Sequence, residues 1–493
     1  MTFHLGSFAI NFGLLLWIAF TIYALGVTVV ILMDNRTPQA SFAWLFLMLA
    51  LPLVGVVVYY FFGRGHKAFS SEEKLARIGM QDARIPEMDY LQDMEDEYIQ
   101  RIAWEKPESY RRRLLHLVRC NSASTITAYN DVEILQNASE KYPRLMEDIR
   151  NAHHSIHLLY YIWTEDEFTL SLKDVLVEKA RSGVKVRALI DAANFVVSQQ
   201  YQDDLLSAGV DVRPYKVYRR LTQLHNVNYR SHRKIAVIDG KIGYIGGMNL
   251  DREQLPGGHP LGDWRDTHLR IDGEAALALQ SSFAISWFNT TGESITSSDY
   301  FPPVRPGARP FIPVQITQSG PDSQWKAMQQ LYFFMIMAAE KSVFIQSPFF
   351  IPDEGLLDAI KAAALSGVDV RIICTPRGAF YQVPYRAAYT YYADVARAGA
   401  RVYLYDRGYF HPKTITIDSA VCAIGTANID IRSFYLNYEA MAVIYDRTMA
   451  RELEADFMED QRNSIEWRLD EYERSPGWRR LLDSVYRLTS PIL

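Results

Sequence analysis

Two long apolar runs dominate the pattern of hydrophobic and polar positions near the start of the chain. The first extends from Phe8 to Met33 and the second from Phe42 to Phe62, with a short polar break at residues 34–39 between them. Each run is long enough to cross about 30 Å of hydrocarbon as a helix. A cleavable signal peptide would need a basic start, a shorter apolar centre and a small-residue cleavage site, which this segment lacks. The pattern predicts a transmembrane helical hairpin over residues 1–65.

Basic residues flank the two runs unevenly. No Lys or Arg precedes the first run. Because the cytoplasmic flanks of membrane helices are enriched in Lys and Arg, we expect the large C-terminal part of the chain to lie in the cytoplasm. The basic residues concerned are Arg36 in the break and, after the second run, Arg64, Lys67, Lys74 and Arg77.

Residues 66–125 form a charged connector of mixed sign. Its segment from Tyr110 to Arg119 places leucines beside arginines with helical spacing. Two interpretations remain open for this segment. It is either an interfacial helix on an anionic leaflet or an ordinary solvated surface helix, which is the simpler of the two.

Beyond the connector, strand and helix patterns follow one another twice in the same order. Alternating strands and helices that end on Gly are typical of βαβ units and of a sheet covered on both faces. We therefore expect an α/β fold with two related repeats, residues 126–300 and 312–493, joined by a Pro-rich linker at 301–311. The matched segments are the strands 152–161 and 339–347, the helices 170–180 and 356–365, the strands 182–191 and 366–374, and the elements at 207–213 and 397–402.

Composition narrows the class of protein. The chain has 493 residues, of which 49% are hydrophobic and 13% aromatic, so it has ample material for a sizeable core. A formal net charge of −5 gives no sign of the overall basicity of a dedicated nucleic-acid binder. The three cysteines are few and unpatterned, which suggests neither a disulfide framework nor a zinc site.

An aromatic cluster lies in the second repeat. It either lines a groove for acyl chains or packs in the core, and the sequence favours neither interpretation. Its members are Phe380, Tyr381, Tyr385, Tyr389, Tyr391 and Tyr392.

One chemical pattern, H-x-K-x4-D, occurs once in each repeat. His and Lys two residues apart project from one face of an extended segment, and an apolar run then carries the chain to the Asp. Each copy is followed at nearly the same distance by a Gly-containing turn and an Asn. The duplication predicts two copies of one structural unit that each deliver an imidazole, an ammonium and a carboxylate. The residues are His232, Lys234, Asp239 and Asn249, and then His411, Lys413, Asp418 and Asn428.

This set of side chains predicts phosphoryl transfer. A neutral imidazole is nucleophilic near pH 7, and a second imidazole can carry the proton that a leaving alkoxide needs. Two ammonium groups offset the charge of a phosphodiester. The reaction then divides into two displacements through a phosphohistidine, the second by water or by another hydroxyl. Because no metal-binding motif competes with this interpretation, we expect no metal and no other cofactor.

The doubled pattern resembles the phospholipase D superfamily, and further stretches are similar to the bacterial cardiolipin synthases within it. These stretches are HRKIAVIDGKIGYIGGMN, WRDTH from Trp264, GTANIDIRS from Gly425, NYE from Asn437, and LPLVGVVVYYFFGR in the second apolar run. The resemblance covers nearly the whole chain. It implies two phospholipase D-like repeats that form a pseudo-twofold catalytic unit, preceded by the hairpin, in a bacterial inner membrane.

Carried over residue by residue, the resemblance makes His232 the nucleophile and His411 the general acid and then base. The sequence alone does not order the two histidines. The groups that would hold the phosphate oxygens are Lys234, Lys413, Asn249 and Asn428.

Four carboxylates complete the expected site. The pattern demands Asp239 and Asp418, either in the chemistry or in fixing the fold through hydrogen bonds. Asp266 and Glu439 are expected at the substrate site, where each accepts the second ring N–H of a histidine and sets its tautomer. An ordinary surface carboxylate is a comparable alternative for Asp266 and a weaker one for Glu439.

The resemblance implies a phosphatidyltransferase that acts on phospholipids at the membrane and not on nucleic acid. One phosphatidylglycerol would form a phosphatidyl-histidine and lose glycerol, and the hydroxyl of a second phosphatidylglycerol would resolve it. The alternatives are a phospholipase D-type hydrolase or nuclease, which would use water, and a catalytically idle scaffold. The sequence leaves open the oligomeric state and whether phosphatidylethanolamine replaces the second phosphatidylglycerol.

Overall fold

The computed structural model describes residues 2–5, 8–33, 38–62, 85–102, 110–215, 228–303, 307, 309–377 and 382–492. Contacts divide the chain into two compact units, Met1–Ala68 with Val217–Asn228, and Phe69–Lys216 with Tyr229–Leu493. The basic residues that support the predicted orientation, Arg36, Arg64, Lys67, Lys74 and Arg77, lie outside the described residues.

The N-terminal unit contains one helix, within its described part, that is long and apolar enough to cross a membrane. β1 (Thr2–Leu5) and β2 (Phe8–Asn11) form a short hairpin, and α1 (Phe12–Met33) follows it. The apolar span covers Gly13–Met33. Its leucines and aromatic residues are largely exposed within this unit, as a lipid-facing helix requires.

The second apolar run differs from the predicted continuous helix. It forms α2 (Pro38–Ala50) and α3 (Pro52–Phe62), of 13 and 11 residues. Pro52 has no backbone N–H to donate and its ring clashes with a carbonyl one turn earlier, so the helix breaks before it. The Tyr23 hydroxyl donates to the Met48 carbonyl at 3.0 Å. At about 20 Å and about 17 Å, neither helix alone crosses the hydrocarbon, so the second span stays a prediction.

Two helices precede the sheet of the large unit and pack against it. α5 (Pro86–Arg101) contacts β3 (Ile126–Gln136), while α6 (Tyr110–Ser122) contacts β14 (Phe311–Ser319) and α11 (Ala327–Ala338). Leu114, Leu115 and Val118 of α6 are buried. Protein therefore covers the apolar side of α6, so this side is not available to a lipid leaflet. Residues 63–84 and 103–109 of the connector region lie outside the described residues.

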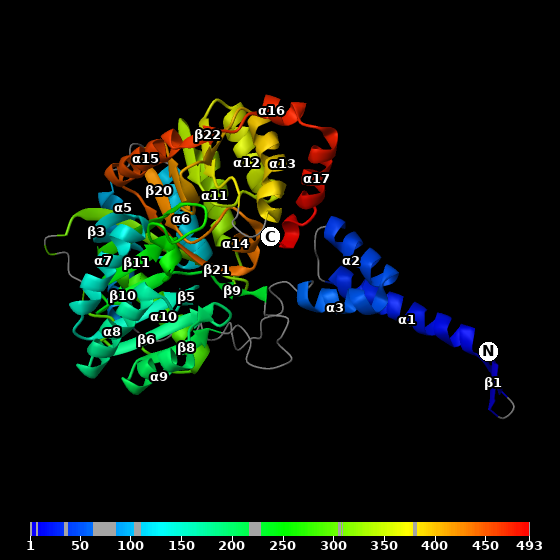
Figure 1. Ribbon diagram of the computed structural model, residues 1–493, viewed down its shortest axis with the longest axis horizontal. Helices are drawn as coiled ribbons and strands as arrows, with labels where there is room; N and C mark the ends of the chain where they lie inside the picture. Colours follow the sequence, from blue (N-terminus) through cyan, green and yellow to red (C-terminus); the bar gives the residue numbers. More distant parts are fainter. Residues whose placement is uncertain are drawn as a thin grey trace. The chain divides into compact units, whose positions relative to one another are not determined.

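A mixed β-sheet runs through the large unit (Figure 1). Its strand order is the same on either side of its centre, except that β22 adds an outer strand to the second half. The antiparallel pair β3 and β14 joins the two halves. Outward from β3 lie β13 (Thr267–Gly273), β11 (Ile242–Gly246), β10 (Ile235–Ile238), β4 (Ser155–Tyr160), β6 (Lys185–Asp191) and β8 (Asp211–Tyr215). Outward from β14 lie β21 (Asn437–Ile444), β20 (Val421–Gly425), β19 (Thr414–Ile417), β15 (Ser342–Gln346), β16 (Asp369–Cys374), β17 (Arg401–Tyr405) and β22 (Ser464–Glu466).

Helices cover the sheet and complete the predicted βαβ order. The first half has α7 (Asn137–Arg150), α8 (Glu167–Arg181), α9 (Gln199–Ser207) and α10 (Ala275–Thr291), and the second has α11, α12 (Glu354–Leu365), α13 (Val383–Arg397) and α15 (Arg447–Arg462). β4, α8, β6, α9 and β8 repeat as β15, α12, β16, α13 and β17. Every residue of β4 is buried, because helices lie on both faces of the sheet. This order confirms the predicted doubled α/β fold.

Local signals explain where the crossover helices begin and end. The Asp166 side chain accepts from Thr169 N at the start of α8, and Asp353 caps α12 in the same way. Gly183 and Gly367 follow these helices with φ of 98° and 93°, which L side chains rarely adopt. The equivalent caps show that one local pattern builds both halves.

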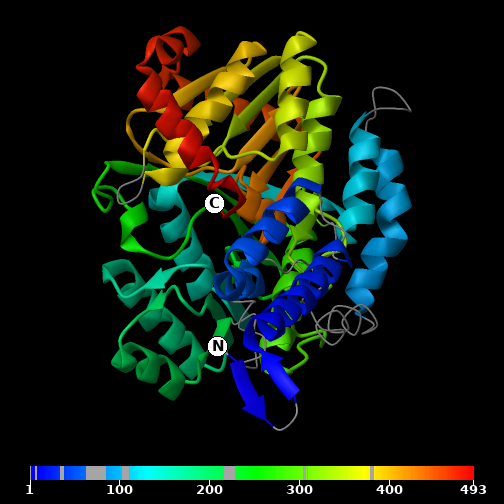
Figure 2. The ribbon, with the colours of Figure 1, turned by 90° about the vertical axis from the view of Figure 1, so that its right-hand side faces the viewer.

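The C-terminal elements pack around α13. α16 (Leu469–Arg474), α17 (Gly477–Arg487) and the short helix η4 (Ser490–Ile492) end the chain, and α17 lies along α13 (Figure 2). Tyr385, Tyr391 and Tyr392 of α13 are buried, so these members of the aromatic cluster pack in the core. Phe380 and Tyr381 lie outside the described residues, as do positions 304–306 and 308 of the Pro-rich linker.

Candidate active site

Two short strand pairs carry each histidine motif across to the other half of the sheet. β9 (Arg230–Ser231) pairs in parallel with the start of β21, and β18 (Gly408–Phe410) pairs in parallel with β12 (Asp263–Arg265). The backbone N–H of His232 donates to the Tyr438 carbonyl at 3.0 Å, and that of His411 donates to the Arg265 carbonyl at 2.7 Å. Each histidine is therefore held by the half that does not contain it.

The histidine side chains are paired across the same seam. Nδ1 of His232 lies 3.0 Å from both carboxylate oxygens of Glu439, and Nδ1 of His411 lies 2.7 Å from Oδ2 of Asp266. Both carboxylates are fully buried. A carboxylate that accepts the Nδ1–H fixes the tautomer and leaves the Nε2 lone pair available. These contacts agree with the expectation that Asp266 and Glu439 each accept the second ring N–H of a histidine, and contact of either carboxylate with substrate stays a prediction.

The two carboxylates are ionised at neutral pH. Burial alone raises the pKa of Glu439, but the attraction and hydrogen bond of His232 outweigh it, so the pKa lies below its usual value. Burial likewise raises the pKa of Asp266, and the nearby Lys413 and His411 bring it below the usual value. Both groups can therefore accept a hydrogen bond from a neutral imidazole.

The histidines themselves are held in the neutral form. Burial lowers the pKa of His411 to about 3, although Asp266 opposes this shift. Burial also lowers the pKa of His232, against the opposing effect of Glu439. Each imidazole in the free protein therefore has the protonation state that a nucleophile or a general base requires.

The two lysines lie beneath the histidines and are almost wholly buried. Lys234 Nζ donates to the His232 carbonyl at 2.7 Å, and Lys413 Nζ donates to the His411 carbonyl. Burial lowers the pKa of Lys413 to about 8 and moves that of Lys234 well below its usual value. An anionic phosphodiester in the site would favour the charged ammonium form of both.

Asp239 and Asp418 do not lie with the histidines, which corrects their assignment as catalytic. Each follows its strand at the end remote from the motif, with φ of 52° and 54°. Asp239 accepts from the backbone N–H groups of residues 153–155 at 2.7–2.9 Å, and Asp418 accepts from those of residues 340–342 at 2.7–3.2 Å. Their role is to fix the start of β4 and β15 against the turn.

The two asparagines occupy equivalent turns, but their contacts differ. Asn249 Oδ1 accepts from the Ile162 N–H at 3.2 Å, whereas Asn428 Nδ2 donates to Asp430 at 3.0 Å. Within the described residues, Asn428 Oδ1 is buried without a hydrogen-bond partner. Contact of either amide with a phosphate oxygen stays a prediction.

Several neighbours of the site were not predicted from the sequence. Tyr161 packs edge-on against His232 at 4.9 Å between ring centroids, and Trp264 packs against His411 at 5.1 Å. The hydroxyl of Thr426 donates to Glu439. Lys141 is fully buried and donates to the Asn249 carbonyl at 3.3 Å. Of these four residues, only Trp264 and Thr426 lie within the stretches that resemble the family. The sequence therefore indicated a place near the site for these two and not for the others.

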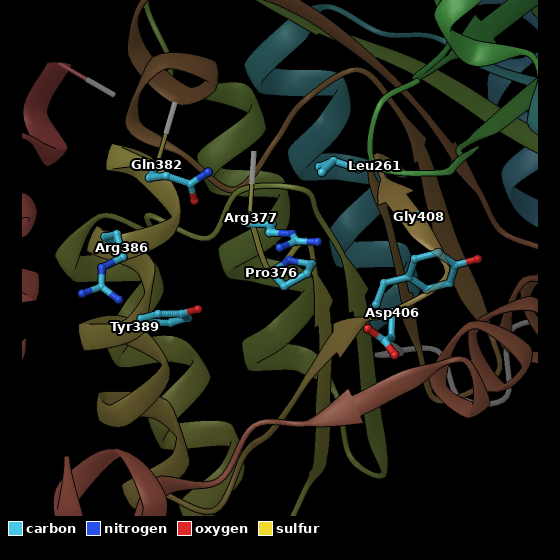
Figure 3. Close-up of a pocket in the computed structure, with 9 residues that line it drawn as sticks. Leu261, Pro376, Arg377, Gln382, Arg386, Tyr389, Asp406 and Gly408 are labelled. Carbon is cyan, nitrogen blue, oxygen red and sulfur yellow. The ribbon is translucent and has the colours of Figure 1, made fainter. Parts of the chain in front are cut away.

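A pocket of about 490 Å³ lies beside the second motif (Figure 3). Gly408, which begins β18 and leads to His411, forms part of its wall. Arg377, Gln382 and Arg386 also line it, and Arg386 belongs to α13. The charged side chains of the lining are Arg377, Arg386 and Asp406, so its net charge is positive, which suits an anionic group.

Two family descriptions match the chain. The one described as "Cardiolipin synthase, PLD-like domain" matches residues 145–277 and 332–461, and each match contains one histidine motif. The one described as "Phospholipase_D-nuclease N-terminal" matches residues 15–64, which hold the apolar helices.

Named relatives and solved structures agree with these matches. The chain is 36% identical to the cardiolipin synthase of Halalkalibacterium halodurans over 96% of this chain and 93% of that one. It is 36% identical to the major cardiolipin synthase ClsA of Bacillus subtilis over 98% of this chain and 99% of that one. The structure of phosphatidylserine synthase from Haemophilus influenzae covers 77% of this chain and 100% of its own with a TM-score of 0.57, at 16% identity, and so shares the fold. The chain belongs to the cardiolipin synthase family of the phospholipase D superfamily.

Proposed function

We propose that the protein synthesises cardiolipin by transferring a phosphatidyl group from one phosphatidylglycerol to a hydroxyl of another, with release of glycerol. Membership of the family supports this activity. The observation that carries the chemistry is the pair of neutral histidines, each held at Nδ1 by a buried carboxylate from the other half.

In the first step, Nε2 of His232 attacks the phosphorus of the first lipid. An N–P bond forms and the P–O bond to glycerol breaks. The glycerol oxygen takes the Nε2 proton of His411, which gains this proton from solvent when the anionic lipid binds and is therefore the imidazolium at this step. Lys234 and Lys413 offset the charge on the phosphate oxygens during this displacement. The product is a phosphatidyl-histidine with free glycerol.

In the second step, a hydroxyl of the second phosphatidylglycerol attacks the same phosphorus. His411, now neutral, takes the hydroxyl proton, the N–P bond breaks, and His232 is regenerated. The net reaction converts two phosphatidylglycerol molecules to one cardiolipin and one glycerol. No oxidant, reductant or metal enters this balance.

The activity is tested by incubating purified full-length protein with labelled phosphatidylglycerol in vesicles and identifying the lipid and headgroup products. Cardiolipin and glycerol in equal amounts support the proposal. Phosphatidic acid would instead establish a hydrolase in which water is the acceptor. A parallel reaction with added phosphatidylethanolamine identifies the accepted second lipid.

The roles of the two histidines are tested by trapping the intermediate. With phosphorus-labelled phosphatidyl-p-nitrophenol, whose p-nitrophenolate leaves without needing a proton, His411→Ala should accumulate label on the protein while His232→Ala should not. The reverse pattern would exchange the two roles.

We also propose that the large unit faces the cytoplasm of the bacterial cell, with the N-terminal helices in the inner membrane. The positive flanks predicted from the sequence support this orientation. Cys120 is exposed, whereas Cys374 and Cys422 are buried, so a membrane-impermeant maleimide reports mainly on Cys120. Labelling should require permeabilised spheroplasts, and labelling of intact ones would contradict the orientation.

A further inference from the structure

The last helix of the chain, α17, points an apolar face at solvent. Its exposed residues recur at helical spacing, as an amphipathic helix requires. The side chains on this face and their exposed fractions are Trp478 at 69%, Leu481 at 66%, Leu482 at 37%, Val485 at 50% and, just past the helix end, Leu488 at 79%.

The polar side of α17 faces the protein, which reverses the usual orientation of a surface helix. Asp483 is fully buried and forms an ion pair with Arg386 of α13 at 3.1 Å. Arg487 forms an ion pair with Asp394 at 2.9 Å. Because these ion pairs fix the rotation of the helix, its apolar side cannot turn inward without breaking them.

We propose that α17 lies in the headgroup region of an anionic bilayer, with this apolar face inserted among the lipids. The combination of Trp and Leu on one face with Arg on its borders is that of interfacial helices. Arg479 is exposed and borders the face, so its charge complements an anionic leaflet. The choice of phosphatidylglycerol as that anionic lipid rests on the proposed function.

The size of the face argues against a second copy of the chain as its occupant. A helix of 11 residues is about 17 Å long and about 10 Å wide. A stable dimer buries about 800 Å² on each partner, several times the footprint of one such helix. A lipid surface needs no minimum area, because insertion adds to the attachment that the N-terminal helix provides.

The inserted helix would set the position of the site relative to the membrane. Arg386 joins α17 and also lines the basic pocket beside β18 (Figure 3). η4, which follows α17, contacts α14 (Ile431–Tyr435), the helix directly after the Asn428 turn. A bilayer that holds α17 therefore brings this pocket to the level of the lipid headgroups.

Insertion is tested with full-length protein in bilayer discs of phosphatidylcholine and phosphatidylglycerol. A fluorophore is placed on Leu481→Cys, and Leu365→Cys serves as the matched control because Leu365 is an equally exposed leucine, at 74%, on α12. Cys120→Ser removes the exposed native thiol. Quenchers attached to the upper acyl chain should quench the probe at 481 and not that at 365. The proposal would be overturned if the probe at 481 were not quenched, either because it is exposed to solvent or because another protein surface covers it.

The consequence for turnover is tested with Leu481→Ser combined with Val485→Ser, and with Leu365→Ser as control. The double variant should synthesise cardiolipin at least about tenfold more slowly in vesicles and at the wild-type rate on short-chain substrate in detergent micelles. An unchanged rate in vesicles would contradict the inference. If wild-type protein makes no cardiolipin in either vesicles or micelles, the proposed function fails instead, so the two failures are distinguishable.

Discussion

Replacing Glu439 by Gln tests whether the pairing between halves controls the chemistry. Glu439 is fully buried and holds Nδ1 of His232 at 3.0 Å with both carboxylate oxygens. It also accepts from Thr426 and, at 3.3 Å, from Asn437. Gln keeps the shape of this side chain and removes its charge.

The expected loss follows from the hydrogen bond and from the tautomer. A hydrogen bond to a charged group contributes about 1.5–3 kcal/mol against about 1 kcal/mol for a neutral pair, so the weaker orientation of His232 costs about tenfold in rate. The Gln amide can also donate to Nδ1, which moves the ring proton to Nε2 and removes the attacking lone pair. We expect kcat to fall by about 10²–10³-fold. Thermal stability should stay close to wild type, because the neutral Gln side chain fills the same space and adds no unpaired charge to the core.

Asp266→Asn is the matched control, since Asp266 holds the other histidine at 2.7 Å. Both variants should be slow on phosphatidylglycerol. A lipid with a p-nitrophenyl headgroup loses its leaving group without protonation, so it should restore phosphoenzyme formation in Asp266→Asn and not in Glu439→Gln. Quench-flow measurement of labelled protein gives this comparison. A Glu439→Gln enzyme within threefold of wild type would refute the reasoning, and rescue of Glu439→Gln alone would reverse the roles.

The remaining predictions concern pH, the strand-end carboxylates and the turn after the first motif. Because burial lowers the pKa of His411 to about 3 and the first step needs a proton on its Nε2, kcat/KM should rise as pH falls through 6.5; a fall centred at 6.5, where an ordinary histidine gains its proton, would contradict this. On the alkaline side, kcat/KM should decline near pH 8 as Lys413 loses its proton, and Lys413→Arg should remove that decline. Asp239→Ala should lower the free energy of unfolding by about 2–3 kcal/mol, because its hydrogen bonds to the backbone are lost. Denaturation measures this loss, and turnover should show an unchanged kcat. A large loss of kcat in folded protein would support a catalytic role for Asp239. Gly247→Ala should reduce kcat at least tenfold, because the added Cβ would lie 2.1 Å from Oδ1 of Asp266. Gly477→Ala is the control and should not change kcat, because its Cβ would meet no atom within 4 Å. Equal kcat values for the two variants would show that the turn rearranges to accept the Cβ.

The doubled fold could be predicted because its signals are local. Apolar strands, amphipathic helices and helix-ending glycines such as Gly183 and Gly367 each act within a few residues, so their repetition is visible in one sequence. The sequence also showed Pro52 inside the second apolar run. Whether a proline kinks or ends a helix depends on what binds the carbonyl groups that lose their helical hydrogen bonds. The hydroxyl of Tyr23, 29 residues before Pro52, donates to the carbonyls of Met48 and Pro52.

The pairing of each histidine with a carboxylate could not be predicted, because it depends on contacts between residues far apart in the sequence. The spacing in the sequence links Asp266 to the first motif and Glu439 to the second, whereas each carboxylate binds the histidine of the other repeat. That exchange depends on the crossing pairs β9–β21 and β12–β18, which are only two or three residues long. Elements so short carry no periodicity, so their pairing is decided by tertiary structure.

The low pKa of His411 fits its two successive tasks only when the substrate takes part. As general acid, His411 must carry a proton on Nε2, which burial opposes in the free protein. The phosphodiester brings a negative charge next to the ring, and Asp266 already holds Nδ1, so both favour the imidazolium while the lipid is bound. When glycerol leaves with the proton, the imidazole returns to the neutral form that burial favours. It can then take the proton of the incoming hydroxyl. The environment that keeps the protonated form scarce in the free protein therefore keeps the neutral, proton-accepting form populated in the intermediate.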